Sequence, residues 1–278
     1  MMARSDIQQI HYCDDRTGAI DKTEAFKYYK LLADQGNDHA QFCVGECYEK
    51  GIGVAKDKAE SFKYWKLSAD QAYAAAYNRL GVCYECGFGV ALDKATAFNY
   101  WKLSAEQGNT DGQRNVGLCY ERGIGVTVDK VEAFKWYKLS ADQGNAYAQC
   151  NVGLCYENGI AITTDKAEAF KYYKLSAEQR CAAGQFNLGL CYEYGYGVAM
   201  DKEEAFKWYQ LSADQGNPYG LQSVGLCYER GTGVARDEAE ACRYYKLSLN
   251  QKCTCDKHND GVCTESESSF ERAGKLCS

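Results

Sequence analysis

The stretch Asp129-Lys-Val-Glu-Ala-Phe-Lys-Trp-Tyr-Lys-Leu-Ser-Ala141 decides the fold, because close copies of it recur along the chain. Its opening aspartate returns at a constant interval of 36 residues, at Asp21, Asp57, Asp93, Asp129, Asp165, Asp201 and Asp237. A fixed period of this length indicates a solenoid, in which each unit buries its apolar face against its neighbours. Such an array offers an extended surface rather than one enclosed pocket, so we expect a binding protein and not an enzyme.

The repeated stretch has the pattern of an amphipathic helix. Asp129 is a favourable N-cap, and Glu132 can complete a capping box by reaching back to the Asp129 amide. Ala133, Phe134, Trp136, Tyr137 and Ala141 then form an apolar face at helical spacing. Most copies end in Gln-Gly-Asn, where glycine suits a left-handed C-cap, at Gly36, Gly108, Gly144 and Gly216. Ala72 and Arg180 replace this glycine in two copies, and Ala161 replaces a turn glycine; we expect local changes of pitch there.

A shorter helix precedes each of these stretches, as at residues 146–158. Ala148, Val152, Cys155 and Tyr156 make its buried stripe. A glycine lies in the middle of every copy and predicts a close approach between helices, because glycine costs about 1 kcal/mol there relative to alanine. The helix ends in a turn such as Gly123-Ile-Gly-Val126. These turns follow a helix and lack a Gly-Lys-Ser/Thr ending, so we interpret them as structural and not as phosphate loops.

Composition narrows the class of partner. The chain has 278 residues, with 32 basic and 38 acidic side chains and a formal charge of −6. This balance gives no electrostatic footprint for nucleic acid or for an anionic membrane. The N-terminal residues have no apolar core typical of a secretory signal, and no stretch approaches the roughly 20 apolar residues of a membrane span. We therefore expect a cytoplasmic protein without a cofactor, whose partner is a protein or a peptide.

The repeat resembles the Sel1-like repeat family, a relative of the tetratricopeptide repeats. Val116-Gly-Leu-Cys-Tyr-Glu-Arg-Gly-Ile-Gly-Val126 is similar to the family pattern Leu-Gly-x-x-Tyr-x-x-Gly-x-Gly-Val. The following Ala133-Phe-Lys-Trp-Tyr-Lys-Leu-Ser-Ala141 is similar to Ala-x-x-Trp-Tyr-x-Lys-Ala-Ala, with Lys-Leu-Ser-Ala in place of Lys-Ala-Ala. The resemblance implies an all-α, right-handed α-solenoid of helix-turn-helix repeats, with the first helices on its concave side. It also implies a role as an adaptor or scaffold, including in signalling.

We divide the chain into three parts. Residues 1–20 are a degenerate N-terminal cap, residues 21–250 a repeat array of about six full repeats, and residues 251–278 a degenerate, cysteine-containing C-terminal cap. Atypical terminal units are expected in a solenoid, because one of their faces meets water.

Cysteines recur with the repeat. One position is shared by Cys47, Cys83, Cys119, Cys155, Cys191 and Cys227, with Cys263 in the degenerate unit. Adjacent helices pack about 8–10 Å apart, whereas disulfides need Cα atoms within roughly 7 Å. The resemblance adds that in disulfide-rich secreted relatives a disulfide joins the first helix of each repeat to the second. Here Cys242 is the single cysteine in the second helices, so that pattern is absent. We expect buried free thiols; the alternative is a secreted, disulfide-rich, hydrolase-like protein that binds β-lactams.

A second alternative is a zinc-assisted assembly module at the C-terminus. Cys253, Cys255, His258 and Cys263 are residue types that ligate zinc and lie within a short span. Zinc modules usually space their cysteines by two to four residues, so the Cys-x-Cys spacing fits poorly. A capping segment that contains thiols is the simpler reading. His11, His39 and His258 form no evident pair with a nucleophile, and no catalytic residues are assigned.

We expect function on the exposed face of the first helices. Helical spacing places four repeat positions there, those of residues 114, 118, 121 and 122. Two positions vary, one holds an apolar residue in every copy after the first, and one always holds glutamate. Together they describe an apolar stripe beside an acidic row. The stripe and row could receive an apolar-basic helix or an extended peptide; alternatively, the leucines pack between repeats and the glutamates pair with neighbouring Arg or Lys. The candidate partner-binding residues are Phe42, Lys50, Asn78, Arg114, Leu118, Glu121, Arg122, Leu154, Glu157, Asn158, Phe186, Leu190, Glu193, Tyr194, Gln222 and Arg230.

Overall fold

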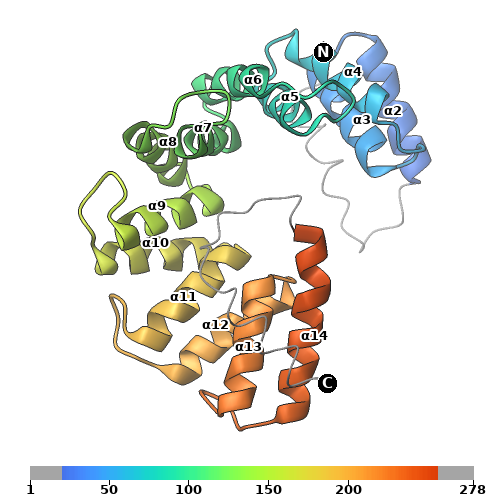
Figure 1. The fold of residues 1–278 in the computed structure, drawn as a ribbon. Helices are drawn as coiled ribbons and strands as arrows, with labels where there is room; N and C mark the ends of the chain where they lie inside the picture. Colours follow the sequence, from blue (N-terminus) through green and yellow to red (C-terminus); the bar gives the residue numbers. More distant parts are fainter. Residues whose placement is uncertain (1–20, 256–278) are drawn as a thin grey trace. The chain divides into compact units, whose positions relative to one another are not determined.

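The computed structural model describes residues 21–255 and the side chains of residues 21–250. Over this range the chain forms thirteen helices and no strand (Figure 1). The first helices of the repeats are α3 (Asp38–Lys50), α5 (Ala74–Cys86), α7 (Thr110–Arg122), α9 (Ala146–Asn158), α11 (Ala182–Tyr194) and α13 (Pro218–Arg230). The second helices are α2 (Lys22–Asp34), α4 (Lys58–Ala69), α6 (Lys94–Glu106), α8 (Lys130–Asp142), α10 (Lys166–Glu178), α12 (Lys202–Asp214) and α14 (Glu238–Cys255). The predicted all-α solenoid of 36-residue repeats is confirmed. None of these helices has the length and apolar character needed to cross a membrane.

The helices group into two compact units. The described part of unit 1 comprises residues 21–112 and 124–127, and that of unit 2 comprises residues 113–123 and 128–255. Inside unit 2 the first helices α9, α11 and α13 each pack against the second helices on either side of them along the chain. Successive first helices also contact one another directly, α9 with α11 and α11 with α13. The exposed residues of these first helices therefore lie side by side within the unit.

The conserved spacing of the aspartates reflects their role as N-caps. In α8, Asp129 Oδ1 accepts hydrogen bonds from the amides of Val131 and Glu132, both at 3.0 Å. The expected capping box is wrong here, because Glu132 pairs with Lys135 Nζ at 2.5 Å instead. The Asp129 amide is already used: it donates to the carbonyl oxygen of Tyr120 at 2.8 Å. The N-cap thus ties each second helix to the end of the first helix before it.

Left-handed residues end the helices as the sequence indicates. Gly36, Gly108, Gly144 and Gly216 have φ values of 89°, 82°, 92° and 79°. Ala72 and Arg180 adopt the same conformation, each with φ of 62°. Both helices keep the hydrogen bond that closes the cap, since the backbone amides of Tyr73 and Cys181 donate to the carbonyl oxygens of Ser68 and Ser176. The expected change of pitch at these sites stays a prediction.

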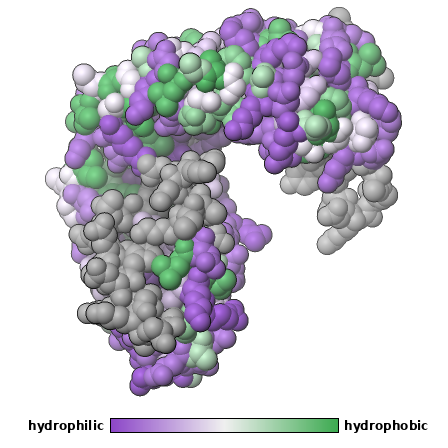
Figure 2. Space-filling view, turned by 45° about the vertical axis from the view of Figure 1, so that its right-hand side comes forward, coloured by the Kyte–Doolittle hydropathy of each residue, from purple (hydrophilic) through white to green (hydrophobic). Residues whose placement is uncertain are grey.

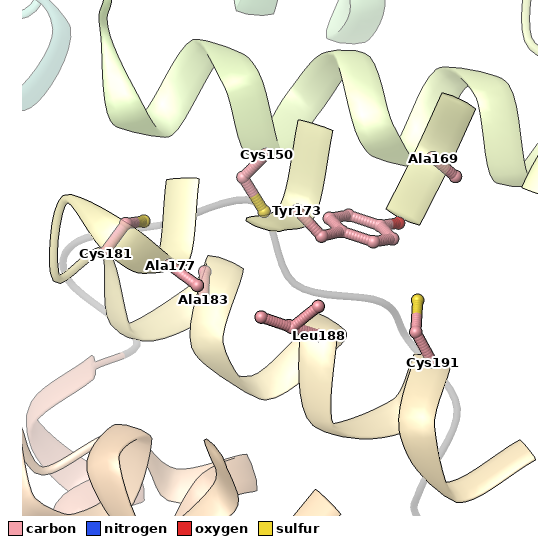
Figure 3. Close-up of a cluster of buried hydrophobic side chains, with 8 residues drawn as sticks. All are labelled: Cys150, Ala169, Tyr173, Ala177, Cys181, Ala183, Leu188 and Cys191. Carbon is pink, nitrogen blue, oxygen red and sulfur yellow. The ribbon is translucent and has the colours of Figure 1, made fainter. Parts of the chain in front are cut away.

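The glycine in the middle of each first helix makes room for an aromatic ring. A Cβ atom on Gly153 would lie 2.6 Å from Tyr173 Cε1, and one on Gly45 would lie 2.5 Å from Trp65 Cδ1. The predicted close approach of helices is therefore confirmed. Figure 3 shows the result in one core cluster, where Tyr173 of α10 lies among Cys150, Leu188 and Cys191 of α9 and α11.

Candidate functional site

The charged side chains of the second helices largely neutralise one another. Lys135 pairs with Glu132, Lys171 with Glu168 and Lys207 with Glu204, each pair one helical turn apart. A second set, which includes Lys138 with Asp142, repeats the pattern near the helix C-termini. Exposed pairs of this type contribute about 0–1 kcal/mol each. Their consequence here is that the second helices carry little net charge.

The glutamates near the ends of the first helices are held in a different way. In unit 2 the Oε2 atom of each accepts a hydrogen bond from a tyrosine hydroxyl sixteen residues later, at 2.5–2.7 Å. The pairs are Glu121 with Tyr137, Glu157 with Tyr173, Glu193 with Tyr209 and Glu229 with Tyr245. Within residues 21–250 no Lys or Arg forms an ion pair with these four carboxylates. For these four glutamates, the alternative in which they pair with neighbouring Arg or Lys is therefore wrong.

Burial fixes the protonation state of the tyrosines. Tyr137 and Tyr209 are each 1% exposed. Burial, followed by the charge of the bonded glutamate, raises the pKa of both hydroxyls well above the usual value. Each tyrosine thus remains a hydrogen-bond donor at neutral pH, and it orients a carboxylate whose other oxygen is left for an external group.

The leucines one turn before these glutamates pack between repeats. Leu118, Leu154 and Leu190 are half-buried and lie against the core clusters of the neighbouring helices. The reading of the leucine row as repeat packing is thus supported, although each leucine keeps part of its surface in solvent. The row therefore provides a narrow apolar strip beside the carboxylates.

The residue that follows each glutamate is exposed. In unit 2 this position holds Arg122, Asn158, Tyr194 and Arg230. Tyr194 is 53% exposed, and its ring stacks on Tyr196 with centroids 5.6 Å apart. Asn158 donates its side-chain amide to the Leu154 carbonyl at 3.0 Å. This is the one expected variable position that remains open to a partner. Figure 2 shows hydrophilic and hydrophobic residues interspersed on one face of the molecule.

The other variable position is mostly not exposed, and this expectation is wrong. Phe186 is 8% exposed and packs against Tyr209 and Tyr219, while Gln222 is 6% exposed. Arg114 lies over the Tyr147 ring at 5.2 Å and donates its Nε to Asn151 at 3.3 Å. The reason is that the next repeat covers this position, so its variation reflects packing.

The candidates in unit 1 are likewise engaged within the unit. Phe42 lies 5.4 Å from the Tyr73 ring, and Asn78 is half-buried. Lys50 pairs with Glu46 at 2.6 Å, and Arg79 Nε approaches the same carboxylate at 2.7 Å. The tyrosine of the unit 2 pairs is replaced by Trp65 and Trp101, whose Nε1 atoms have no hydrogen-bond partner. Unit 2 therefore holds the more regular carboxylate row.

Sequence reasoning missed two features of this surface. Tyr147 is 44% exposed and lies on the first helix α9, at a position that was not assigned. The tyrosine hydroxyls that orient the glutamates were assigned only to the core. A signal for the hydroxyl bonds was present in the sequence: tyrosine at 137, 173, 209 and 245 always lies sixteen residues after a glutamate.

The cysteines in the repeats are free thiols, as expected. Nine of the ten that are free among the described side chains are buried, and Cys86 is exposed. Burial raises the pKa of Cys155 and Cys191 to about 12. Cys242 differs, because it forms a disulfide. The four residues considered as zinc ligands, Cys253, Cys255, His258 and Cys263, and the two proposed caps lie outside the described side chains.

Comparisons with known proteins agree with this geometry. A family model described as Sel1 repeat matches seven consecutive segments, at residues 14–37, 38–73, 74–109, 110–145, 146–181, 182–217 and 218–253. A Sel1 repeat protein from Oxalobacter formigenes has 27% identity and a TM-score of 0.73, over 83% of this chain and 97% of that one. The protective antigen c5321 of uropathogenic Escherichia coli has 29% identity and a TM-score of 0.67. That match covers 92% of this chain and 57% of the antigen's chain, so this chain matches little more than half of the antigen.

A more distant structure shares the fold alone. The immunity protein Pa5087 from Pseudomonas aeruginosa has 18% identity and a TM-score of 0.52, over 89% of this chain and 87% of that one. Among curated proteins, none matches the chain.

Proposed function

Because the chain belongs to the Sel1 repeat family, we propose that it is a non-catalytic scaffold that binds a protein partner through the exposed side of its first helices. The observation that carries this proposal is the carboxylate row of unit 2. Its four glutamates are held by tyrosine hydroxyls and are not neutralised by basic residues among residues 21–250. A fixed charge of one sign gives specificity and speeds encounter with a partner of opposite charge.

The exposed position after each glutamate supplies the variation that a specific surface needs. Arg122, Asn158, Tyr194 and Arg230 differ in charge and size, while the positions beside them are constant. Tyrosine and arginine are enriched at the residues that dominate binding energy. We assign partner contact to these four residues, and we withdraw Phe186 and Gln222 because they are buried.

A cytoplasmic location is part of the proposal. Ten free thiols fit a reducing compartment, whereas the disulfide of Cys242 is typical of an oxidising one. The redox state of Cys242 in the cell decides between the two compartments. It is measured in protein trapped with an alkylating reagent at the moment of cell lysis. A reduced Cys242 supports the cytoplasmic assignment, and an oxidised one contradicts it.

The hydrolase-like alternative is disfavoured by the same thiols. It requires disulfides that join the first to the second helix, but Cys119, Cys155, Cys191 and Cys227 of the first helices are free. The zinc-assisted alternative is tested by the metal content of the purified full-length chain. One zinc per chain would support it.

The test of the proposed function is affinity capture from native lysate with the full chain. The test variant carries Arg122→Ala, Tyr194→Ala and Arg230→Ala, all at exposed positions. The matched control carries Lys135→Ala, Leu175→Ala and Lys207→Ala, which change exposed residues of the second helices. We expect a partner that the wild type and the control retain and the test variant loses. A partner retained by the test variant but lost by the control would move the site to the second helices.

A further inference from the structure

We propose that the segment bound by unit 2 is an extended peptide in the polyproline II conformation, with two basic residues three positions apart that pair with Glu157 and Glu193. This inference rests on the proposed function and specifies the chemistry of the partner. It follows from how the carboxylates are held, which charges surround them and how far apart the first helices lie.

The two carboxylates are oriented before any partner arrives. The hydroxyl of Tyr173 lies 2.6 Å from Glu157 Oε2, and that of Tyr209 lies 2.5 Å from Glu193 Oε2. Both glutamates are half-buried, and within residues 21–250 neither is bonded by a basic side chain. The remaining oxygen of each is fixed in place, so less side-chain freedom is lost when a cation binds.

The residue that follows each glutamate distinguishes the middle of the row from its ends. Glu121 is followed by Arg122 and Glu229 by Arg230, so a cation that approaches either end of the row meets an arginine on the same helical turn, although neither arginine pairs with the glutamate. Glu157 is followed by Asn158 and Glu193 by Tyr194, neither of which is charged. The exposed Tyr194 ring beside Glu193 adds a surface on which a Lys or Arg of the partner can lie. Two cations therefore match the middle pair, and further cations at either end gain little.

The spacing of the helices sets the spacing in the partner. The first helices α9 and α11 contact directly, and contacting helices have axes about 8–10 Å apart. A polyproline II chain rises about 3.1 Å per residue with three residues per turn, so every third side chain points the same way after about 9 Å. In a β-strand the third side chain points to the opposite face. In an α-helix one turn advances only about 5.4 Å.

The apolar strip suits the residues between the two cations. Leu154 and Leu190 lie one turn before Glu157 and Glu193 and keep part of their surface in solvent. Proline is compatible with the polyproline II conformation and presents an apolar ring without an unpaired amide hydrogen. The motif that fits is thus a basic residue, two prolines or other apolar residues, and a second basic residue.

The test uses three acetylated peptides of identical composition, with one, two or four prolines between two lysines and the other prolines moved to the ends. Binding to the full chain is measured by calorimetry at low and high salt. We expect the two-proline peptide to bind about two- to fivefold more tightly than the others, since a misplaced lysine loses one ion pair. Salt should weaken its binding most.

Matched variants locate the site. Glu157→Gln with Glu193→Gln should remove the preference for two prolines, because the amide oxygens still accept the tyrosine bonds but carry no charge. Glu168→Gln with Glu204→Gln removes two charges from the second helices and should leave the preference intact. Equal affinity for the three peptides, no binding at all, or equal loss in both variants would overturn the inference. The capture experiment succeeds or fails independently of this one, because its test variant changes Arg122, Tyr194 and Arg230 and leaves Glu157 and Glu193 in place.

Discussion

Within residues 21–250, residues other than glycine occupy left-handed positions at three places, and each costs stability. Ala161 has a φ of 64° where the equivalent Gly125 has 68°. A Cβ atom on Gly125 would lie 2.1 Å from the carbonyl oxygen of Lys94, so this turn is crowded in the other copy. The left-handed conformation itself costs about 1–2 kcal/mol for a residue with a Cβ atom.

We therefore predict that Ala161→Gly raises the free energy of unfolding by about 1 kcal/mol, since glycine removes the strain but loses more backbone entropy. Arg180→Gly should act in the same direction by a smaller amount. Urea denaturation followed by circular dichroism measures both. The reciprocal control is Gly125→Ala, which should destabilise. A lower midpoint for Ala161→Gly would contradict the prediction.

The buried thiols make stability depend on alkaline pH. Burial raises the pKa of Cys155 and Cys191 from 9.0 to about 12. The thiolate forms more readily in the unfolded chain, so the contribution of each thiol to stability is complete below pH 9 and is lost as the pH rises toward 12. We predict a falling denaturation midpoint across this window, with a shallower slope in Cys155→Ala with Cys191→Ala. Burial also raises the pKa of the exposed Cys86, but less than that of the two buried thiols, so Cys86→Ala is the comparison and should reduce the slope less.

Among the contacts between helices, the most distinctive is the hydrogen bond from a tyrosine hydroxyl of a second helix to the glutamate of the preceding first helix. Tyr209 is 1% exposed and donates to the charged Glu193 at 2.5 Å. We predict that Tyr209→Phe lowers the free energy of unfolding by about 1.5–3 kcal/mol, the range for hydrogen bonds to charged groups. The control is Tyr192→Phe, a half-buried ring that packs edge-on against Phe170. Equal effects of the two substitutions, read from thermal denaturation, would show that the hydroxyl bond is not responsible.

The elements also show what sequence can predict. The end of helix 146–158 and the start of α10 followed from local signals, because the left-handed Gly159 and the N-cap Asp165 each act within one turn. The burial of Phe186 could not be predicted in this way, since a helical period places a residue on a face but does not say which repeat covers that face. The bond from Tyr137 to Glu121 joins two helices, so it depends on tertiary packing.

At the scale of the whole molecule, stability should be distributed unevenly. A repeat contacts its neighbours along the chain, and distant repeats are linked only through those between them. The chain moreover divides into two compact units. Unit 1 contains α2–α6 and residues 110–112 of α7, and unit 2 contains the rest of α7 and α8–α14. A local change should therefore open its own unit without opening the other, as expected for cooperative segments of unequal stability.

A matched pair of glycine substitutions tests this independence. Gly189→Ala in α11 would place a Cβ atom 2.5 Å from Tyr209 Cε1, and Gly45→Ala in α3 would place one 2.5 Å from Trp65 Cδ1. Each overpacks one core by about 1–3 kcal/mol, which corresponds to amide exchange roughly 5- to 150-fold faster in the affected helices. We predict faster hydrogen exchange in α11–α13 for Gly189→Ala and in α3–α5 for Gly45→Ala, measured by mass spectrometry. Equal acceleration in both units by either substitution would mean that the repeats unfold as one body, because a single cooperative transition exposes every amide together.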